Sequence, residues 1–206
     1  RDLHLSIRRQ RQMCIRDSFE ITDKSEIFAF VEANAFGQLI SNVDGRLYST
    51  HLPFLLSKDG SKITGHLALQ NPQLAEIDGQ EVLVTLEGPH DYISPAWYSS
   101  PGVPTWNYQA VHIYGQCSTF RSAEKLEEIV NALTKKHEAT SPTPWQPDYK
   151  PSMLGAIVGV EVIINEVQCK YKLSQNRSTK DRLQVIEQLK AVGSNKLAEA
   201  MERNEL

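Results

Sequence analysis

The 206-residue sequence lacks several features that identify common functional classes. Its three cysteines show neither CxxC nor Cys/His ligand spacing, so the sequence gives no support for structural zinc. It contains no run of about eighteen apolar residues, and we therefore predict no transmembrane helix. The start of the chain lacks the apolar segment of a signal peptide. These observations predict a cytoplasmic protein that does not associate with membranes.

The common catalytic and nucleotide-binding motifs are also missing. Neither GxGxxG nor GxxxxGK[ST] occurs, which argues against Rossmann and P-loop nucleotide sites. There is no HExxH motif, no evident carboxylate pair and no nucleophile elbow, so hydrolysis and acyl transfer are not indicated. These motifs therefore do not identify an enzymatic activity, although such an activity stays open.

Positive charge is scarce once the first eighteen residues are set aside. The segment RRQRQMCIRDS could be a basic arm or a transit peptide, but it resembles translated sequencing adapter, and we interpret 1–18 as an artefact or disordered scar. The net charge of the whole chain is −3, and without the five Arg and two Asp of that segment it becomes −6. Because DNA affinity comes mostly from Lys and Arg, direct DNA binding is disfavoured. The clearest basic cluster, 169–172 with Arg177, Lys180 and Arg182, is also typical of a solvated helix start.

Turn signals and alternating apolar residues predict a protein that is mainly β, with flanking helices. Asp-Gly pairs at 44–45, 59–60 and 78–79 separate strand-like runs. We expect five to seven antiparallel strands in a closed or partly closed barrel, because closure removes exposed strand edges. The expected strands cover 37–43, 46–56, 61–69, 81–88, 110–120 and 160–173.

Helical periodicity appears at both ends and in the middle of the chain. We predict a helix through 26–36 with Thr22 as N-cap and Gly37 as its terminator. Ser122 would cap a second long helix. The other expected helices cover 72–77, 180–192 and 195–204. The sequence thus divides into 1–18, a barrel domain over 19–175 and a helical tail over 176–206 packed on the barrel.

An aromatic stretch at 88–108, GPHDYISPAWYSSPGVPTWNY, stands out between two of these strands. It contains two Trp, three Tyr, one His and four Pro, an unusual composition for a connecting loop. We interpret it as a rigid loop that presents rings to a planar ligand or to a second subunit. A loop folded over its own sheet is an equally supported alternative.

Two shorter motifs carry polar groups suited to a cofactor. The run Ser49-Thr50-His51-Leu52-Pro53 ends a predicted strand and offers hydroxyls and an imidazole for a flavin edge or a phosphate. The run 64–73, with His66 and Asn71, leads from a strand into a helix start, where an anion is favoured. An ordinary strand end and an ordinary Asn-Pro helix start explain the same residues.

Five motifs in this order give the sequence a specific resemblance: STHLPFLL, TGHLALQNPQ, GPHDYISPAWY, VPTWNYQAVHIYG and CKYKLSQNRS. Together they resemble the PaiB family of FMN-binding negative transcriptional regulators, from about residue 19 to the C-terminus. The resemblance implies an FMN-binding split β-barrel of antiparallel Greek-key type, related to pyridoxamine-phosphate oxidases. It also implies a homodimer with FMN between subunits, and repression of degradative enzymes and sporulation.

The same resemblance implies roles for individual residues. Ser49, Thr50, His51, Leu52 and Pro53 would line the isoalloxazine. His66 and Asn71 would lie near the phosphate, and Trp97, Tyr98, Trp106 and Asn107 would close the cleft from the partner subunit. The family commonly has a basic residue where this chain has Leu69. Losing an Arg–phosphate fork would cost about 1.5–3 kcal/mol, so we expect weakened FMN binding.

Three functional hypotheses follow. The first is an FMN-binding regulator that represses indirectly, through a protein partner or a small-molecule signal. The second is a flavin- or haem-dependent oxidoreductase, with haem the less favoured cofactor and an axial ligand drawn from His51, His66, His90 and His112. The third is a cofactor-free dimeric interaction module.

Overall fold

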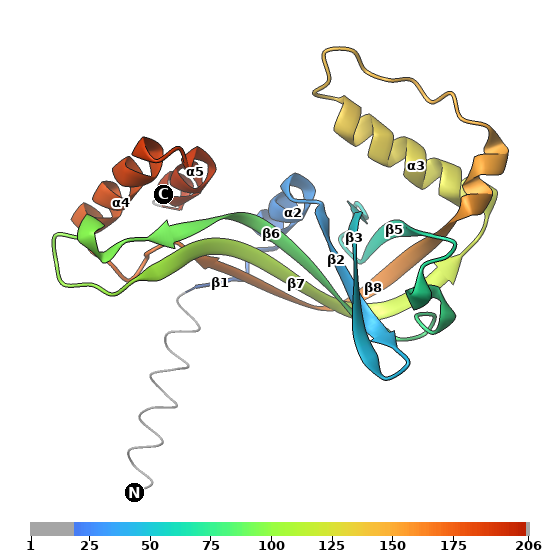
Figure 1. Cartoon of the computed structure of the whole chain (residues 1–206), viewed down its shortest axis with the longest axis horizontal. Coiled ribbons are helices and arrows are strands. Elements are labelled where there is room, and N and C mark those ends of the chain that lie inside the picture. The colour runs from blue at the N-terminus through green and yellow to red at the C-terminus, as the bar shows by residue number, and fades with distance from the viewer. Residues whose placement is uncertain (1–18, 205–206) are drawn as a thin grey trace, which may run out of the picture. The chain divides into compact units, whose positions relative to one another are not determined.

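The structure, a computed structural model, describes residues 19–204 (Figure 1). The predicted artefact at 1–18 lies outside the described residues. Within them, eight strands form one sheet in the order β3-β2-β6-β7-β8-β5-β4, with β1 paired to β8. The strands are β1 Glu20–Ile21, β2 Phe36–Val43, β3 Arg46–Pro53, β4 Leu55–Leu56, β5 Lys62–Ala68, β6 Glu81–Ile93, β7 Thr105–Phe120 and β8 Ile157–Lys172.

The sheet connectivity matches the predicted antiparallel Greek-key type. β2 pairs antiparallel with β3 and with β6, and β5 pairs antiparallel with β4 and with β8. The neighbours β2 and β6, and likewise β5 and β8, are not consecutive in the chain, so the sheet contains crossovers and is not a simple meander. The eight strands exceed the five to seven predicted because the two-residue strand β1 was not predicted and the strand expected over 46–56 is divided into β3 and β4.

Helices occur where the sequence periodicity predicted them. They are α2 Lys24–Ala33, α3 Ala123–Glu138, α4 Thr179–Ala191 and α5 Asn195–Arg203, with 3₁₀ turns η1 Pro72–Ala75, η2 Pro95–Trp97 and η3 Pro151–Ala156. Ser122 caps α3 as predicted, because its side chain accepts a hydrogen bond from the backbone N–H of Lys125. The helix predicted over 72–77 is instead the shorter 3₁₀ turn η1.

The predicted end of the first helix is wrong. α2 stops at Ala33, and Gly37 lies inside β2, paired with Leu52 on one side and Leu86 on the other. A Cβ on Gly37 would lie 2.2 Å from the carbonyl oxygen of Thr85. Glycine is required there by the close approach of a neighbouring strand, and not by a left-handed helix end.

The prediction of an aromatic loop over 88–108 is also wrong in extent. β6 continues to Ile93 and β7 begins at Thr105, so only 94–104 connects them. Gly88 and Ile93 are buried on β6, and Asn107 is buried on β7, so both ends of this stretch are packed as strand residues. The high Pro and Trp content obscured these strand ends in the sequence.

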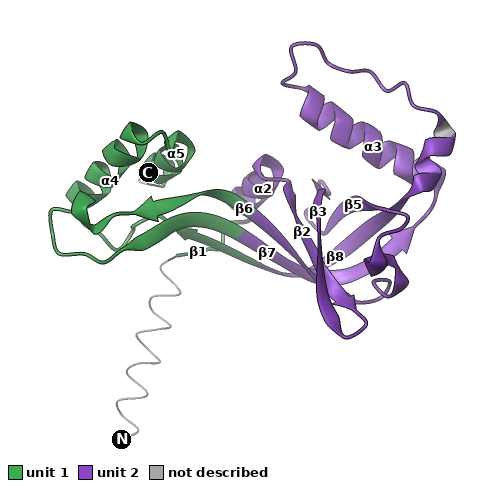
Figure 2. Cartoon of the chain, in the orientation of Figure 1, with its two compact units in different colours: residues 1–23, 87–110, 168–206 green, residues 24–86, 111–167 purple. Residues whose placement is uncertain are grey.

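The chain forms two compact units (Figure 2). In its described part, unit 1 contains residues up to Asp23 together with Glu87–Ala110 and the chain from Gln168 onward. Unit 2 contains Lys24–Leu86 and Val111–Val167. β6, β7 and β8 each contribute residues to both units. The two C-terminal helices therefore belong with the β6–β7 hairpin segment in unit 1.

Each unit has an apolar interior supplied by alternating strand residues and helix faces. In unit 2 the fully buried side chains include Leu39, Ile63, Val84, Ile113 and Val162. In unit 1 they include Ile93, Leu173, Leu189, Leu197 and Met201. In α2 the buried residues are Ile27, Phe30 and Val31, which lie on one face of the helix.

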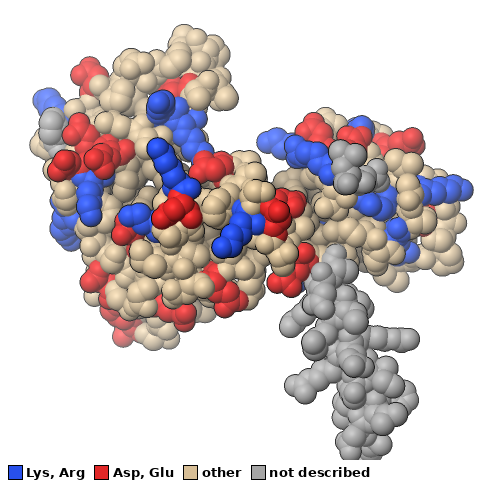
Figure 3. All heavy atoms as spheres, turned by 180° about the vertical axis from the view of Figure 1, so that it is seen from behind, with Lys and Arg blue, Asp and Glu red and all other residues tan. Residues whose placement is uncertain are grey.

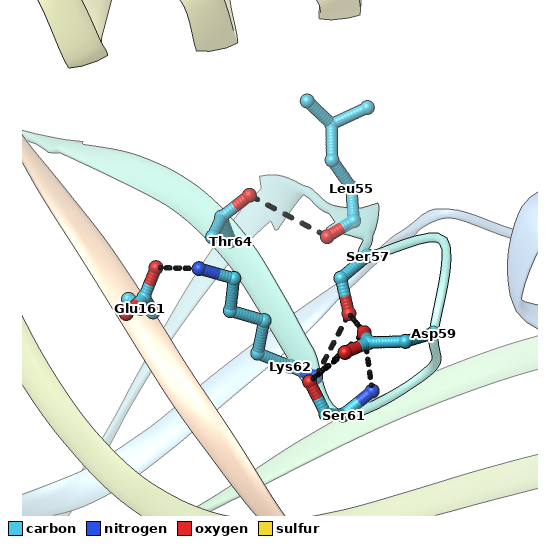
Figure 4. Close-up of polar contacts among 7 residues, drawn as sticks. All are labelled: Leu55, Ser57, Asp59, Ser61, Lys62, Thr64 and Glu161. Carbon is cyan, nitrogen blue, oxygen red and sulfur yellow. Dashed lines mark hydrogen bonds and ion pairs between the residues drawn. The ribbon is translucent and has the colours of Figure 1, made fainter.

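The β4–β5 turn in unit 2 is held by a carboxylate (Figure 4). Oδ1 of Asp59 accepts hydrogen bonds from Oγ of Ser57 at 2.6 Å and from the backbone N–H of Ser61 at 3.1 Å. These bonds, led by the Ser57 hydroxyl, lower the pKa of Asp59 to about 2. Lys62, the first residue of β5, forms a 2.8 Å ion pair with Glu161 of β8. The turn and the ion pair fix the start of the strand that carries His66.

Candidate cofactor site

Asn71 links the start of η1 to strand β3 in unit 2. Its side-chain oxygen accepts a hydrogen bond from the backbone N–H of Gln73 at 2.9 Å, which caps η1. Its Nδ2 donates to Oγ1 of Thr50 at 2.8 Å. The structure thus brings Thr50 and Asn71, two residues predicted for the site, into direct contact.

Gln73 attaches η1 to strands β2 and β3, and the sequence did not predict this role. Its side chain is fully buried, and Nε2 donates to the carbonyl oxygen of Leu39, Oγ of Ser41 and the carbonyl oxygen of Tyr48 at 2.8–3.3 Å. Its Oε1 is buried and has no partner among the described residues. A glutamine in the polar run PQLAEI gives no periodic signal, so only the fold identifies its role.

Strand β3 carries the predicted residues 49–53 and stands at one end of the sheet order. His51 stacks on Phe36 of β2 with ring centroids 6.2 Å apart and an interplanar angle of 24°. Oγ of Ser49 donates to Oε1 of Gln38 at 2.9 Å. Leu52 is buried and Pro53 is half-buried. The strand thus exposes Ser49 and His51, whereas Thr50 is half-buried.

The surface beside these residues is unusually apolar for an exposed strand pair. Phe36 is 62% exposed and Leu47 is 81% exposed, while Tyr48 is 38% exposed. These side chains are spread along the β2–β3 hairpin, and exposed apolar area on an end strand is typical of an interaction site. The outward backbone groups of an end strand are available for hydrogen bonding to a ligand.

His66 on β5 is half-buried, and it pairs in register with Gly159 of β8. Burial lowers its pKa below the ordinary value of 6.5, so the imidazole is neutral at pH 7. Nδ1 has no hydrogen-bond partner among the described residues. Leu69 is 38% exposed and donates its backbone N–H to the carbonyl oxygen of Ala156. Neither residue supplies a positive charge for a phosphate.

The other predicted residues belong to unit 1. Trp97 ends η2, and Tyr98 lies under Arg177, whose guanidinium carbon is 4.2 Å from the ring centroid. Asn107 is fully buried, and its Nδ2 donates to Oγ of Ser174 at 3.0 Å. Asn107 therefore packs against the interior of this unit. Trp106, its neighbour on β7, is 53% exposed.

The connection at 94–104 is fastened to α4 by Asp181. The carboxylate accepts hydrogen bonds from the hydroxyl and backbone N–H of Ser99, both at 2.7 Å, and from the hydroxyl of Ser100 at 2.8 Å. These bonds, led by the hydroxyl of Ser99, hold the pKa of Asp181 far below its usual range. Trp97 and Tyr98 are thus presented by an anchored segment.

Comparison with known proteins identifies the family. The model of the family described as "Putative FMN-binding domain" matches residues 13–166. The "Protease synthase and sporulation protein PAI 2" of Bacillus subtilis is 42% identical over 201 residues, covering 92% of this chain and 97% of that protein. This chain belongs to the PaiB family of FMN-binding-domain proteins. The uncharacterised protein AN0679 from Emericella nidulans is 30% identical, and the match covers 80% of this chain and 85% of that protein.

Solved structures confirm the split-barrel fold predicted for the family. The flavocytochrome Anf3 from Azotobacter vinelandii superposes with a TM-score of 0.63 at 14% identity, covering 80% of this chain and 75% of that chain. The FAD and heme binding protein from Mycobacterium smegmatis superposes with a TM-score of 0.61 at 12% identity, covering 84% of this chain and 80% of that chain. At these identities the likeness establishes the fold alone.

Two further observations concern membranes and metals. Within residues 19–204, no helix is both long and apolar enough to cross a bilayer. The same residues contain no group of three or more His, Cys, Asp and Glu side chains placed to hold a metal ion. The two cysteines of the described chain, Cys117 and Cys169, are both buried.

Proposed function

We propose that the chain binds FMN along β3 and η1 and acts, as a homodimer, as a negative regulator of transcription that represses indirectly. The observation that carries the cofactor assignment is the hydrogen-bonded pair Thr50–Asn71 on an exposed end strand, in a chain of the FMN-binding PaiB family. When bound, FMN would supply an isoalloxazine ring that exchanges electrons or reports the redox state.

The residues of unit 2 fit the ring end of FMN. Thr50 and Ser49 offer hydroxyls, and His51 offers a ring already stacked on Phe36. Flavin edges carry both donors and acceptors, which the backbone and hydroxyl groups of an end strand can match. The exposed Phe36, Leu47 and Tyr48 supply apolar area for a second subunit next to these groups. The placement of the partner's Trp97, Tyr98 and Trp106 at the cleft stays a prediction.

The phosphate end fits less well. His66 is neutral at pH 7 because burial lowers its pKa, and Leu69 carries no charge. The capped start of η1 is a single 3₁₀ turn, and Asn71 already occupies the N–H of Gln73. We therefore expect FMN to bind through its ring more than through its phosphate, with an affinity below that of relatives that have the basic residue.

Charge supports indirect repression. Lys and Arg lie among Asp and Glu on the face shown in Figure 3, without a continuous basic stripe there. In the basic cluster noted in the sequence, Lys172 bonds to Thr105, Arg177 covers Tyr98, and Arg182 donates to the carbonyl oxygen of Met201. Three basic side chains of the cluster are therefore engaged in contacts within unit 1. A protein partner or a small-molecule signal is therefore a better route to repression than DNA contact.

The test is a titration of the full chain with FMN, followed by flavin fluorescence, with subunit mass measured in parallel. We expect saturable quenching near one FMN per subunit of a dimer. Leu69→Arg should tighten binding roughly 10-fold or more by restoring a charge-assisted phosphate contact, whereas Leu69→Gln should not. A folded dimer that ignores FMN in all three forms would contradict the cofactor assignment and favour the cofactor-free interaction module.

Haem is the second candidate cofactor, and His66 favours it. A neutral imidazole with an unpartnered ring nitrogen is the form that ligates iron. Haem titration of wild type and His66→Ala checks this, and His66 is the ligand only if the wild type shows a Soret shift that the variant lacks. Reduction of the FMN-loaded protein by NAD(P)H tests the oxidoreductase hypothesis separately.

A further inference from the structure

Trp106 forms the centre of an exposed aromatic group on β6 and β7, within unit 1. Its ring centroid is 6.3 Å from that of Tyr92, in an edge-on arrangement, and 6.4 Å from that of His90. Trp106 is 53% exposed and Tyr92 is 40% exposed. Side chains this large are normally buried, so their exposure on a strand pair indicates a surface that meets something else.

A pocket of about 320 Å³ opens beside Trp106. It is lined by Glu87, His90, Trp106, Tyr108, Gln109 and Ala110, which all belong to unit 1. The volume lies at the lower end of the range found for small-molecule sites. The six lining residues include neither lysine nor arginine, and Glu87 is the carboxylate among them. A phosphate or carboxylate ligand would find no opposite charge in this pocket.

The histidine adds a second acceptor. Nδ1 of His90 is 3.1 Å from the carbonyl oxygen of Gly88. A carbonyl oxygen can only accept a hydrogen bond, so Nδ1 carries the hydrogen, which leaves Nε2 as an acceptor when the ring is uncharged. Glu87 and His90 thus both favour a ligand that donates N–H hydrogen bonds. The faces of Trp106 and Tyr108 attract cations through their ring quadrupoles.

We propose that this pocket binds a small organic ammonium ion, with its N–H groups directed to Glu87 and His90 and its carbon body against Trp106. The site goes beyond the proposed function, because it lies wholly in unit 1, whereas the FMN contacts proposed along β3 and η1 lie in unit 2. A small amine that binds in this pocket would be a signal that acts on the regulator. It is also a different use of Trp106 from the flavin contact that the sequence resemblance implies.

The experiment is calorimetric titration of the full chain with three probes of similar shape: benzylammonium, benzyl alcohol and benzoate. We expect saturable binding of benzylammonium with a dissociation constant on the order of 1 mM, as suits a fragment of this size. Benzyl alcohol should bind roughly 5-fold more weakly or worse, because it lacks the charge. Benzoate should not bind measurably. Equal binding of benzoate and benzylammonium would overturn the proposal.

Variants assign the binding to this pocket. Glu87→Gln should weaken benzylammonium binding roughly 5-fold and leave FMN affinity unchanged, because it removes the charge and keeps the shape. Trp106→Leu should abolish benzylammonium binding, whereas Trp145→Leu, which changes a tryptophan outside the pocket that is 47% exposed, should not. Thermal unfolding confirms that each variant is folded.

Two other outcomes would refute the pocket. If wild type ignores benzylammonium and Trp106→Leu loses FMN, Trp106 belongs to the flavin cleft. If wild type ignores benzylammonium and Trp106→Leu forms monomers, the aromatic group is a contact between two copies of the chain.

Discussion

Nδ2 of Asn71 lies 2.8 Å from Oγ1 of Thr50, so the residue that caps η1 also holds the hydroxyl of the end strand β3. The two groups are 21 residues apart in sequence. Their contact requires η1 to lie against the β2–β3 hairpin, and the buried Gln73 provides that attachment. The orientation of the candidate FMN strand is therefore coupled to a short turn that follows β5.

Asn71 can be separated into a capping role and a binding role. Asn71→Ala should lower the free energy of unfolding by about 0.5–2 kcal/mol, because the cap is lost. Asn71→Ser retains a capping oxygen and should cost little stability, but it removes the donor to Thr50. Both variants should weaken FMN binding in the fluorescence titration. Asn34→Ala, which removes another side-chain amide bond in unit 2, to the carbonyl oxygen of Phe30, should leave FMN affinity intact.

Gln73 should be among the most sensitive polar positions in unit 2. Gln73→Leu leaves the carbonyl oxygens of Leu39 and Tyr48 and the hydroxyl of Ser41 without this donor in a buried setting. We expect a loss of about 2–4 kcal/mol in the free energy of unfolding, measured with urea. Gln80→Leu is the matched control, because Gln80 bonds to both backbone groups of Asn42 but is only half-buried. Equal losses in the two variants would show that burial of the amide is irrelevant.

Local sequence signals predicted most of the elements. The Asp44-Gly45 turn has positive φ at both residues, as a tight hairpin demands, and it joins β2 to β3 in the expected place. The helices α4 and α5 begin and end within a residue of the predicted bounds, and α3 begins directly after Ser122, as predicted. The role of Gly37 was predicted wrongly because the residue that leaves no room for a side chain there is Thr85, 48 positions away in the chain. Close approach between distant strands leaves no local pattern.

The candidate site was predicted only in part. The motif residues of β3 and η1 could be chosen from their chemistry and family resemblance, and Thr50 and Asn71 do touch. Asn107 carries an equally polar side chain in an equally distinctive motif, yet it is buried against Ser174. Whether an amide faces a ligand or a core depends on which strand face the C-terminal helices cover, and that is a tertiary fact. The role of Gln73 could not be predicted from the sequence for the same reason.

Gly115 should tolerate no side chain. A Cβ at this position of β7 would lie 2.1 Å from the carbonyl oxygen of Ile163 on β8, and backbone cannot move aside as a flexible side chain can. Gly115→Ala should therefore cost at least about 1–3 kcal/mol of stability or prevent folding. Gly155→Ala, where no atom lies within 4 Å of the added Cβ, should change stability by less than about 0.5 kcal/mol. Urea unfolding of both variants checks the packing of these two strands.

His66 should make stability depend on pH. Burial lowers the folded-state pKa of the imidazole below its ordinary value of 6.5, so the unfolded chain binds more protons as the pH falls through that value. The contribution of His66 is fully present above about pH 7, and the free energy of unfolding should decrease as the pH drops from 7 towards 5. His66→Gln should flatten this decrease, whereas His137→Gln, on the exposed side of α3, should not. Urea unfolding at three pH values in that window measures the slope, and an unchanged slope in His66→Gln would show that the imidazole is not held in its neutral form by the fold.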